Sequence, residues 1–519
     1  MKIKNLSLFL AGSVLMAGGT HASAQALNFT AGDLVVSTVS DQINPGTQTA
    51  GDLDTASSIT LDQFALGTGA TSATAAGSLT LPTVSSGSNN AISGEYGSAS
   101  EGILQDSVNG AYLTIMGYGV NASTFNTDGQ NLATDPYGTA ALGQTTSLTG
   151  GTDTTVPRVV ALIGANGSVN TSTALTGVFN ENNPRSVATV NGSSFYVSGQ
   201  GVTGDGTGGI FYATLGSTTA TAINNNTTSG NSLTGAVASQ GTETRSVQIV
   251  NTGTSSSPDY TLMASRDFGV SGTPNDATDI RSFTTASGAL PTSATGLTAT
   301  RVIPDVASSK PNFGSINLTL ALDNTVNSSR NGSIVYLSPE QFFLAAPNVM
   351  YVADSGEPKN GQVNTAGLGE GGLQKWVNSE PDGSGTWSLE YDLSLGLNLV
   401  NNANATSANP TATGVTGLFG LAGQVESNGT IELFATSYGL NELSSSYLYE
   451  INDSLTATTP ANGEAFTTLE DAPSGTLFRG VAFAPEAIAA PEPSTTSMLI
   501  LALLGGFAFA WKRKKSLKA

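Results

Sequence analysis

The chain has 519 residues, with 38 acidic and 18 basic side chains, a net charge of −20, no cysteine and a single histidine. The absence of cysteine excludes disulfide frameworks, cysteine-zinc sites, iron–sulfur clusters and thiol nucleophiles. His21 lies in an apolar leader, so removal of the leader would also exclude Ser-His-Asp triads, histidine general bases and histidine-bound metals. Hydrophobic residues make up 39% of the chain, which is enough to bury a core.

The N-terminus has the pattern of a secretory signal peptide. Two lysines precede an apolar stretch, Leu6–Gly18, that is too short to be a comfortable membrane span. Ala22 and Ala24 then form a small-x-small cleavage pattern. We expect a signal peptide over residues 1–24, with cleavage after residue 26 as a second register, and export through the secretion translocon. An uncleaved N-terminal anchor is the alternative.

The body, residues 27–488, consists of short runs of β-branched and aromatic residues bounded by Gly, Asn, Asp or Ser, which predicts β-strands. The clearest runs are Leu34–Val39, Tyr112–Gly117, Ser194–Ser198, Tyr260–Ser265, Val349–Ala353 and Thr430–Thr436. Asn-Gly and Asp-Gly dipeptides typical of hairpin turns occur at 191–192, 331–332, 382–383 and 428–429.

These runs repeat at a coarse period of roughly 50–65 residues, with about four strands in each unit. Arg185–Gly192, Arg245–Asn251, Thr416–Gly423 and Phe478–Pro485 resemble one another as the first strand of successive units. The period predicts an all-β fold, a single β-propeller of about seven four-stranded blades, with six or eight as alternatives. The run near Asp33 and the last run could share the closing blade. A β-helix or a tandem of β-sandwiches is the competing architecture.

The C-terminus has three parts: Pro491-Glu492-Pro493, an uncharged stretch over 494–511, and a basic tail over 512–518 that begins Lys512-Arg513-Lys514-Lys515. As a helix, the uncharged stretch would be about 27 Å long, so it can just cross a bilayer. The basic cluster should stay cytoplasmic, which places the body outside the inner membrane.

This three-part pattern over residues 489–519 resembles the PEP-CTERM sorting signal of bacteria. The resemblance implies recognition by an exosortase, a membrane cysteine protease/transpeptidase, which removes the anchor and delivers the body to the cell surface or the extracellular space. An ordinary C-terminal tail anchor after a proline-rich linker is the alternative.

The body also resembles a set of exported bacterial propeller proteins that carry PEP-CTERM tails. The resemblance supports the propeller and implies no activity. The matching stretches are Phe29–Val36, Ser100–Leu104, Asn109–Leu113, Pro157–Ala161, Asn182–Ser186, Leu373–Trp376 and Phe478–Ala482.

Charge is divided unequally along the chain. The body between Gln25 and Ala490 has 11 basic and 37 acidic residues, a net charge of −26. Such a body should be repelled by nucleic acid and by anionic lipid, so we expect no nucleic-acid partner. Solubility of a Gly/Ser/Thr-rich surface is the simpler reason for the acidity.

Several carboxylates are candidates for chemistry. Glu380 with Asp382, and Asp354 with Glu357, could face a propeller funnel, where two carboxylates can hydrolyse a glycoside without histidine. Asp52 and Asp54 could bind Ca²⁺ together with a loop carbonyl, or be solvated loop acids. The glycine runs 204–209 and 367–372 lack the lysine and following helix of a phosphate-binding loop, so we interpret them as turns or blade loops.

Scarce arginines and a tryptophan pair are the remaining candidates. The arginines could form ion pairs between blades or contact a ligand in the funnel. Trp376 and Trp387 could be a hairpin pair in a blade core or a sugar-stacking surface. The arginines concerned are Arg158, Arg185, Arg245, Arg301 and Arg479.

From the sequence we expect a non-enzymatic protein of the cell surface or extracellular matrix, with a role linked to exopolysaccharide or biofilm. No catalytic, cofactor-binding or metal-binding residue is assigned, although Ca²⁺ stays an alternative. The competing functions are a secreted carboxylate-dependent polysaccharide hydrolase and a calcium-dependent adhesin.

Overall fold

The computed structural model describes residues 27–43, 55–98, 100–128, 141–150, 154–202, 204–225, 244–253, 257–266, 279–303, 322–323, 338–356, 371–400, 413–441 and 443–487. Within these ranges the regular secondary structure is almost entirely β-strand, with a short helix α1 (Ala122–Asp128) and two 3-10 turns, η1 (Thr68–Ala70) and η2 (Leu142–Gln144). The predicted signal peptide, the predicted span over 494–511 and the basic tail lie outside the described residues.

The described residues form six separate sheets, five of them purely antiparallel. From its inner edge outwards, the first sheet has β27 (Thr476–Phe483), β1 (Leu34–Ser40), β3 (Thr60–Leu66) and β4 (Ala73–Thr80). In the same order, the second has β6 (Gln105–Asp106), β7 (Tyr112–Tyr118), β8 (Arg158–Gly164) and β9 (Val169–Leu175). It also contains β5 (Ser93–Tyr96), which pairs with β7, and β2 (Thr55–Ser58), which pairs with β5.

The other four sheets also run outwards from an inner strand. The third has β10 (Pro184–Ala188), β11 (Ser194–Gly199), β12 (Gly209–Thr214) and β13 (Thr221–Asn225). The fourth has β14 (Thr244–Asn251), β15 (Tyr260–Arg266), β16 (Asp279–Thr285) and β17 (Leu297–Ile303). The fifth has β19 (Pro339–Ala346), β20 (Val349–Asp354), β21 (Gly372–Asn378), β22 (Trp387–Leu393) and a short parallel strand β18 (Leu322–Asp323). The sixth has β23 (Val415–Val425), β24 (Thr430–Gly439), β25 (Tyr447–Ser454) and β26 (Thr467–Asp471).

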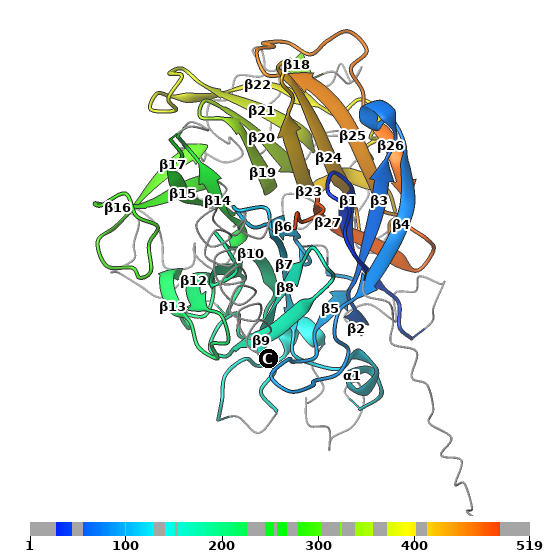
Figure 1. Cartoon of the computed structure of the whole chain (residues 1–519), viewed down its shortest axis with the longest axis vertical. Helices are drawn as coiled ribbons and strands as arrows, with labels where there is room; N and C mark the ends of the chain where they lie inside the picture. Colours follow the sequence, from blue (N-terminus) through cyan, green and yellow to red (C-terminus); the bar gives the residue numbers. More distant parts are fainter. Residues whose placement is uncertain are drawn as a thin grey trace, which may run out of the picture.

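The sheets are arranged radially as the blades of a β-propeller (Figure 1). The inner strands contact one another in the cyclic order β27, β6, β10, β14, β19, β23 and back to β27. A separate hydrophobic cluster lies between each pair of neighbouring blades. Between the first and second blades, for example, Val35 and Leu61 pack with Leu113 and Ile115. Each blade therefore buries its faces only against its neighbours, as a propeller requires.

The favoured count of seven blades was wrong: the described residues form six, which was one of the two alternatives. The error has a physical origin in the connections between strands. The connection between β7 and β8 alone runs from residue 119 to 157, so the second blade is far longer than the unit period taken from the shorter blades. The prediction that Arg185, Arg245, Thr416 and Phe478 mark equivalent strands was correct, because β10, β14, β23 and β27 are all inner strands.

The ring closes as expected, by pairing the two ends of the body. Strand β1 lies between β27 and β3, with Leu34 opposite Phe483 on one side and Phe64 on the other. Figure 1 shows β1, in blue, beside β27, in orange-red. Gly480 of β27 donates its N–H to Gly102 O at 3.0 Å, and a Cβ on Gly480 would lie 2.1 Å from a backbone nitrogen. Only glycine fits this contact between the first and second blades.

The two faces of the ring differ in how the strands are joined. We call the face at which the inner strands begin the start face, and the face at which they finish the end face. The end face has short turns, including the predicted Asn191-Gly192, Asp382-Gly383 and Asn428-Gly429 hairpins. Strand β7 runs from the end face to the start face, so the described parts of the connection 119–157, including α1, lie on the start face. The predicted hairpin at 331–332 lies outside the described residues.

Candidate functional site

The inner strands surround a cavity of about 190 Å³ on the axis of the ring. Each described inner strand contributes residues to its wall, and in every strand except β19 these come from the half nearer the end face. The accessible polar groups belong to Asp106 and Gln248. Ile249, Phe343 and Phe483 add half-buried apolar surface. The wall thus combines hydrogen-bonding groups with apolar faces, as small-molecule sites do.

Asp106 is the carboxylate of this cavity. Its side chain is exposed at the wall of the cavity, which the inner strands of the other blades also line. This enclosure raises the pKa of Asp106 to about 7, and a hydrogen bond from the backbone N–H of Phe483 lowers it only partly. The group therefore changes charge near neutral pH.

Amide side chains brace the wall of the channel. Gln105 Nε2 donates to Ser186 Oγ and, at 2.8 Å, to the carbonyl of Val247, which links three neighbouring blades. Gln341 Oε1 accepts the backbone N–H of Leu421 at 2.9 Å and links the fifth blade to the sixth. Such fixed amides leave the channel preorganised rather than soft.

Buried charges lie on the start-face side of the cavity. Arg245 Nη1 forms an ion pair with Glu340 Oε1 at 3.0 Å, joining β14 to β19. Arg185 Nη2 donates to Gln200 Oε1 at 2.9 Å. The interpretation of Arg245 as an ion pair between blades is therefore confirmed, and Arg185 is held within its own blade.

A second polar cluster lies between the first and second blades. Tyr118 donates its hydroxyl hydrogen bond to Glu101 Oε1, and Glu101 Oε2 accepts the backbone N–H of Glu95 at 3.3 Å. Burial raises the pKa of Glu101 to about 7, against the opposing influence of Tyr118 and of the positive charges of Arg479 and Arg158. The adjoining cavity is only about 10 Å³, which is room for one water.

Arg158 and Arg479 are both buried in this cluster. Arg158 Nη2 donates to the carbonyls of Thr145, Phe179 and Asn182 at 2.8–2.9 Å, so it ties down backbone rather than a ligand. Arg479 is buried, and its Nη2 has no hydrogen-bond partner in the described part of the chain. Burial lowers the pKa of Arg479 to about 10, and the carboxylate of Glu101 opposes that change.

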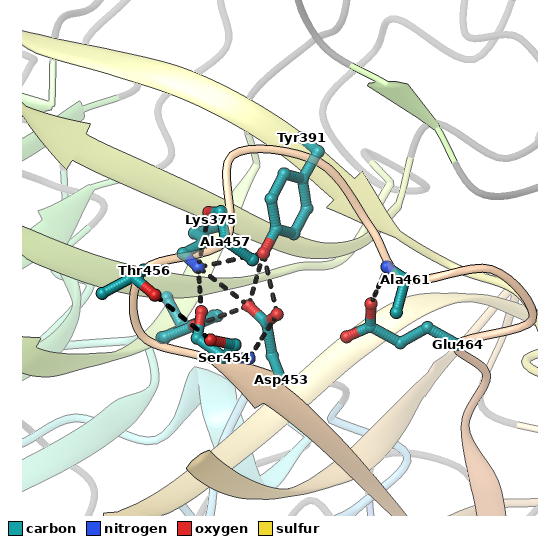
Figure 2. Close-up of polar contacts among 9 residues, drawn as sticks. Lys375, Tyr391, Asp453, Ser454, Thr456, Ala457, Ala461 and Glu464 are labelled. Atoms are coloured by element: carbon teal, nitrogen blue, oxygen red, sulfur yellow. Dashed lines mark hydrogen bonds and ion pairs between the residues drawn. The ribbon is translucent and has the colours of Figure 1, made fainter. Parts of the chain in front are cut away.

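A third cluster lies between the fifth and sixth blades (Figure 2). Lys375 Nζ is fully buried and lies 3.1 Å from Asp453 Oδ2. It also donates to the hydroxyl of Tyr391 at 2.9 Å and to the carbonyls of Ser454 and Ala457 at 2.6 and 3.0 Å. All of these partners belong to the protein, so this lysine holds the β25–β26 connection against β21 and has no free donor directed at a ligand.

Two tyrosine hydroxyls also form hydrogen bonds with the carboxylate of Asp453. Tyr351 donates to Asp453 Oδ2 at 2.6 Å, and Tyr391 donates to the same oxygen at 2.6 Å. Burial raises the pKa of Tyr391 well above its ordinary value, and the hydrogen bond to Asp453 adds to the shift. Figure 2 shows Glu464 on the other side of Asp453, where burial raises its pKa to about 7.

Replacing Tyr351 with phenylalanine should lower the free energy of unfolding by about 1.5–3 kcal/mol, the usual cost of losing a hydrogen bond to a charged group. Urea denaturation followed by circular dichroism measures the change. Tyr447→Phe is the matched control, because the Tyr447 hydroxyl makes no hydrogen bond within the described residues. Equal stabilities for the two variants would contradict the assignment.

A fourth cluster lies within the fourth blade. Asp279 is fully buried and accepts Arg266 Nε at 2.7 Å and Nη2 at 2.8 Å, a bidentate pair. Arg281 Nε donates to Asp279 Oδ2 at 2.8 Å, and Arg301 Nε lies 3.3 Å from the same oxygen. Arg301 is 42% exposed, so of the predicted arginines it is the one at the edge of an ion-pair network.

None of the candidate carboxylates that the structure describes lines the central cavity. Glu380 and Asp382 are exposed in the turn between β21 and β22, on the outer part of the end face. Asp354 is buried at the other end of the blade, where it accepts hydrogen bonds from Ser338 N and Gln374 Nε2. Glu357 lies outside the described residues, as do Asp52 and Asp54 of the calcium alternative.

The tryptophan pair belongs to a blade core. Trp376 is buried, and Trp387 packs partly buried against the same hydrophobic cluster. Asn378 pairs with Trp387 across the β21–β22 hairpin. Trp376 lies opposite Leu389, so the two tryptophans are diagonal neighbours in the hairpin and not a direct pair. The blade-core interpretation is confirmed, and the sugar-stacking alternative is excluded for Trp376. The glycine run 204–209 forms the connection between β11 and β12, as expected for a blade loop.

Sequence reasoning missed the channel residues Asp106, Gln248 and Phe343. Asp106 belongs to a two-residue strand that carries no periodic signal. The available signal was positional: Gln248 is the fourth residue of the run beginning at Arg245, which was already interpreted as a first strand. Among the described residues no group of three or more Asp, Glu, His or Cys side chains could hold a metal ion.

The C-terminal pattern matches a known family of sorting signals. Residues 489–514 match the family described as the PEP-CTERM protein-sorting motif. The chain carries a PEP-CTERM motif. The motif suggests an exported protein, sorted by an exosortase, on a propeller fold. None of the helices that the structure describes has the length and apolar character needed to cross a membrane.

Other comparisons give only remote likenesses. No curated protein matches the chain. A candidate 6-phosphogluconolactonase from Bacteroides fragilis is 13% identical, with 88% of this chain and 85% of that one covered and a TM-score of 0.33. A protein from Lactobacillus plantarum is 9% identical, with 85% and 82% covered and a TM-score of 0.33. An α-L-arabinofuranosidase from Lactobacillus brevis is 10% identical, with 55% and 71% covered and a TM-score of 0.28. These values are too low to bear on the function of this chain.

Proposed function

We propose that this chain is an exported protein, delivered to the cell surface or extracellular matrix by an exosortase, whose propeller binds glycan without turning it over. The PEP-CTERM match over residues 489–514 supports the sorting step. The central channel supports the binding step, because its wall pairs Asp106 and Gln248 with the apolar rings of Phe343 and Phe483. Sugars present hydroxyl edges and apolar C–H faces, which suit such a wall.

The size of the channel limits which ligands it can bind. A cavity of about 150 Å³ can hold a single benzene ring, so the 190 Å³ here has room for one six-membered ring. The interior of a polysaccharide chain would not fit. The ligand we propose is therefore the terminal residue of an exopolysaccharide chain, inserted at the channel mouth on the end face.

Binding suits the channel better than hydrolysis. A glycosidase of the usual kind needs two carboxyl groups on either side of the bond it breaks. Asp106 is the sole carboxylate among the described residues that line the cavity. One carboxylate can accept hydrogen bonds from two hydroxyls of a sugar, which supports the non-enzymatic role.

Asp106→Asn should weaken glycan binding by about tenfold or more, because a hydrogen bond to a charged group is lost while the side chain keeps its shape. Binding to the purified exopolysaccharide and to a glycan array measures the effect. Because the raised pKa of Asp106 is about 7, the wild-type affinity should rise as the pH increases from 6 to 8, and the variant should lose this dependence. Asp382→Asn, in an exposed turn, is the control.

The outcomes separate the alternatives. Release of a shorter product would favour a hydrolase, and loss of binding on chelation of calcium would favour a calcium-dependent adhesin. Binding by neither the wild type nor the control would remove the glycan proposal. For sorting, the mass of the mature chain is compared in strains with and without the exosortase, and a retained C-terminus in both would refute processing.

A further inference from the structure

The C-terminal end of the body leaves the propeller at the rim of the channel. Phe483, the last residue of β27, lines the central cavity. The next residues continue on the end face, where Ala484 N donates to Asp33 O at 2.8 Å and Glu486 N donates to Gly110 O at 2.7 Å. The tail therefore departs close to the axis of the ring and not from the outer edge of a blade.

The tether between the body and the predicted span is short. Residues 487–493 separate Glu486 from the start of the uncharged stretch. Fully extended, these seven residues reach roughly 25 Å, at about 3.3–3.6 Å per residue. Pro491 and Pro493 restrict the backbone further. A short tether attached at the centre of one face keeps that face towards the membrane.

Electrostatic attraction does not contribute to this orientation. No lysine or arginine occurs in the turns of the end face that the structure describes, while Asp259, Glu426 and Glu486 do. Basic clusters are what bind proteins to anionic lipid surfaces. The end face is thus held near the bilayer by its covalent tether alone.

We propose that the channel mouth faces the lipid bilayer while the tail is uncut, which restricts the access of polymers to it, and that exosortase processing removes this restriction. The start face points away from the membrane in both states. This proposal rests on the proposed sorting of the chain. It adds that sorting and binding are coupled, because the same cut that releases the protein exposes its binding site.

The absence of cysteine makes a direct test available, since each introduced cysteine is the sole thiol of the chain. Ser193→Cys places the thiol in the β10–β11 turn on the end face, and Ser123→Cys places it on α1 at the start face, both at exposed positions. The full chain is expressed in cells lacking the exosortase, and spheroplasts are treated with a maleimide attached to a large polymer. The rate of modification is measured on gels for each variant.

In the anchored protein we expect the thiol of Ser193→Cys to react several-fold more slowly than that of Ser123→Cys. Two changes should equalise the rates: processing in cells that contain the exosortase, and insertion of a flexible Gly/Ser linker of about 40 residues after Ala487 in the unprocessed chain. Equal rates in the anchored protein, or a difference that persists with the long linker, would overturn the proposed orientation.

A second arm separates this proposal from the sorting proposal. Residues 494–519 are replaced by an unrelated single-spanning helix that no exosortase recognises, with residues 487–493 unchanged. Because the short tether is unchanged, we expect the same slow reaction of Ser193→Cys in this chimera. A protected thiol in the chimera together with an unprocessed native tail would refute sorting alone, while a reactive thiol in the chimera refutes the orientation.

Discussion

Asp279→Asn is expected to lower the free energy of unfolding by about 3–5 kcal/mol, the usual cost of breaking a buried ion pair. Asp279 neutralises Arg266 and Arg281, which are 1% and 4% exposed, and also contacts Arg301. An asparagine cannot offset their charge, so the two buried guanidinium groups would lose the carboxylate that they share. Chemical denaturation of the purified body measures the loss.

The pH dependence of this effect has a defined sign. Burial alone would raise the pKa of Asp279, but Arg266 and Arg281 outweigh it and hold the pKa below its ordinary value of 3.8. The stabilisation is therefore complete above pH values near 3.8 and is lost as the pH falls through the lower folded-state pKa. The difference between variant and wild type should shrink in strong acid. Asp382→Asn should leave stability unchanged, and an equal loss in that variant would contradict the argument.

Deletion of residues 27–40 is expected to abolish cooperative folding of the propeller. The deletion removes β1, which is the only link between β27 and β3 in the described closing blade. It also removes the buried side chains of Leu34, Val35, Val36 and Val39. At about 1.5–3 kcal/mol each, their burial contributes roughly 6–12 kcal/mol, an upper estimate. Domains have a total stability of only about 5–15 kcal/mol.

Calorimetry of the deleted chain should show no cooperative transition. A synthetic peptide with residues 27–43 should restore the transition if it can insert between β27 and β3. A peptide in which Val36 is replaced by aspartate is the control, because its carboxylate would enter the buried cluster between the sixth and first blades. An unchanged transition in the deleted chain would show that the ring does not depend on β1.

Individual strands and the closing pair could be predicted because their signals are local. Runs such as Tyr112–Gly117 and Thr430–Thr436 carry their own β-propensity and turn residues, and both are strands in the structure. The similarity of Phe478–Pro485 to earlier first strands placed it correctly at the inner edge of the closing blade. The blade count depends instead on the lengths of connections such as 119–157, for which strand propensity gives no period.

The candidate site was less accessible to sequence reasoning, because it exists only where separate blades meet. Asp106 and Phe343 are 237 positions apart and meet on the propeller axis. Arg245 was correctly expected to have an ion-pair role, since a scarce cation at the start of an inner strand must be neutralised when buried. The acids singled out at Glu380 and Asp382 were predicted from local density, which does not place them on the axis.

The distribution of cations has a consequence for resistance to proteases. Of the eight basic residues in the described part of the body, seven are less than 9% exposed, and Arg301 is the exception. Proteases that cut after lysine or arginine need those side chains, with the adjoining backbone, in an extended accessible form. Across the described residues, a protein so built offers trypsin-like enzymes almost no sites while its blades are closed. Cleavage at these seven positions requires unfolding, so resistance to proteolysis at them scales with the stability of the ring.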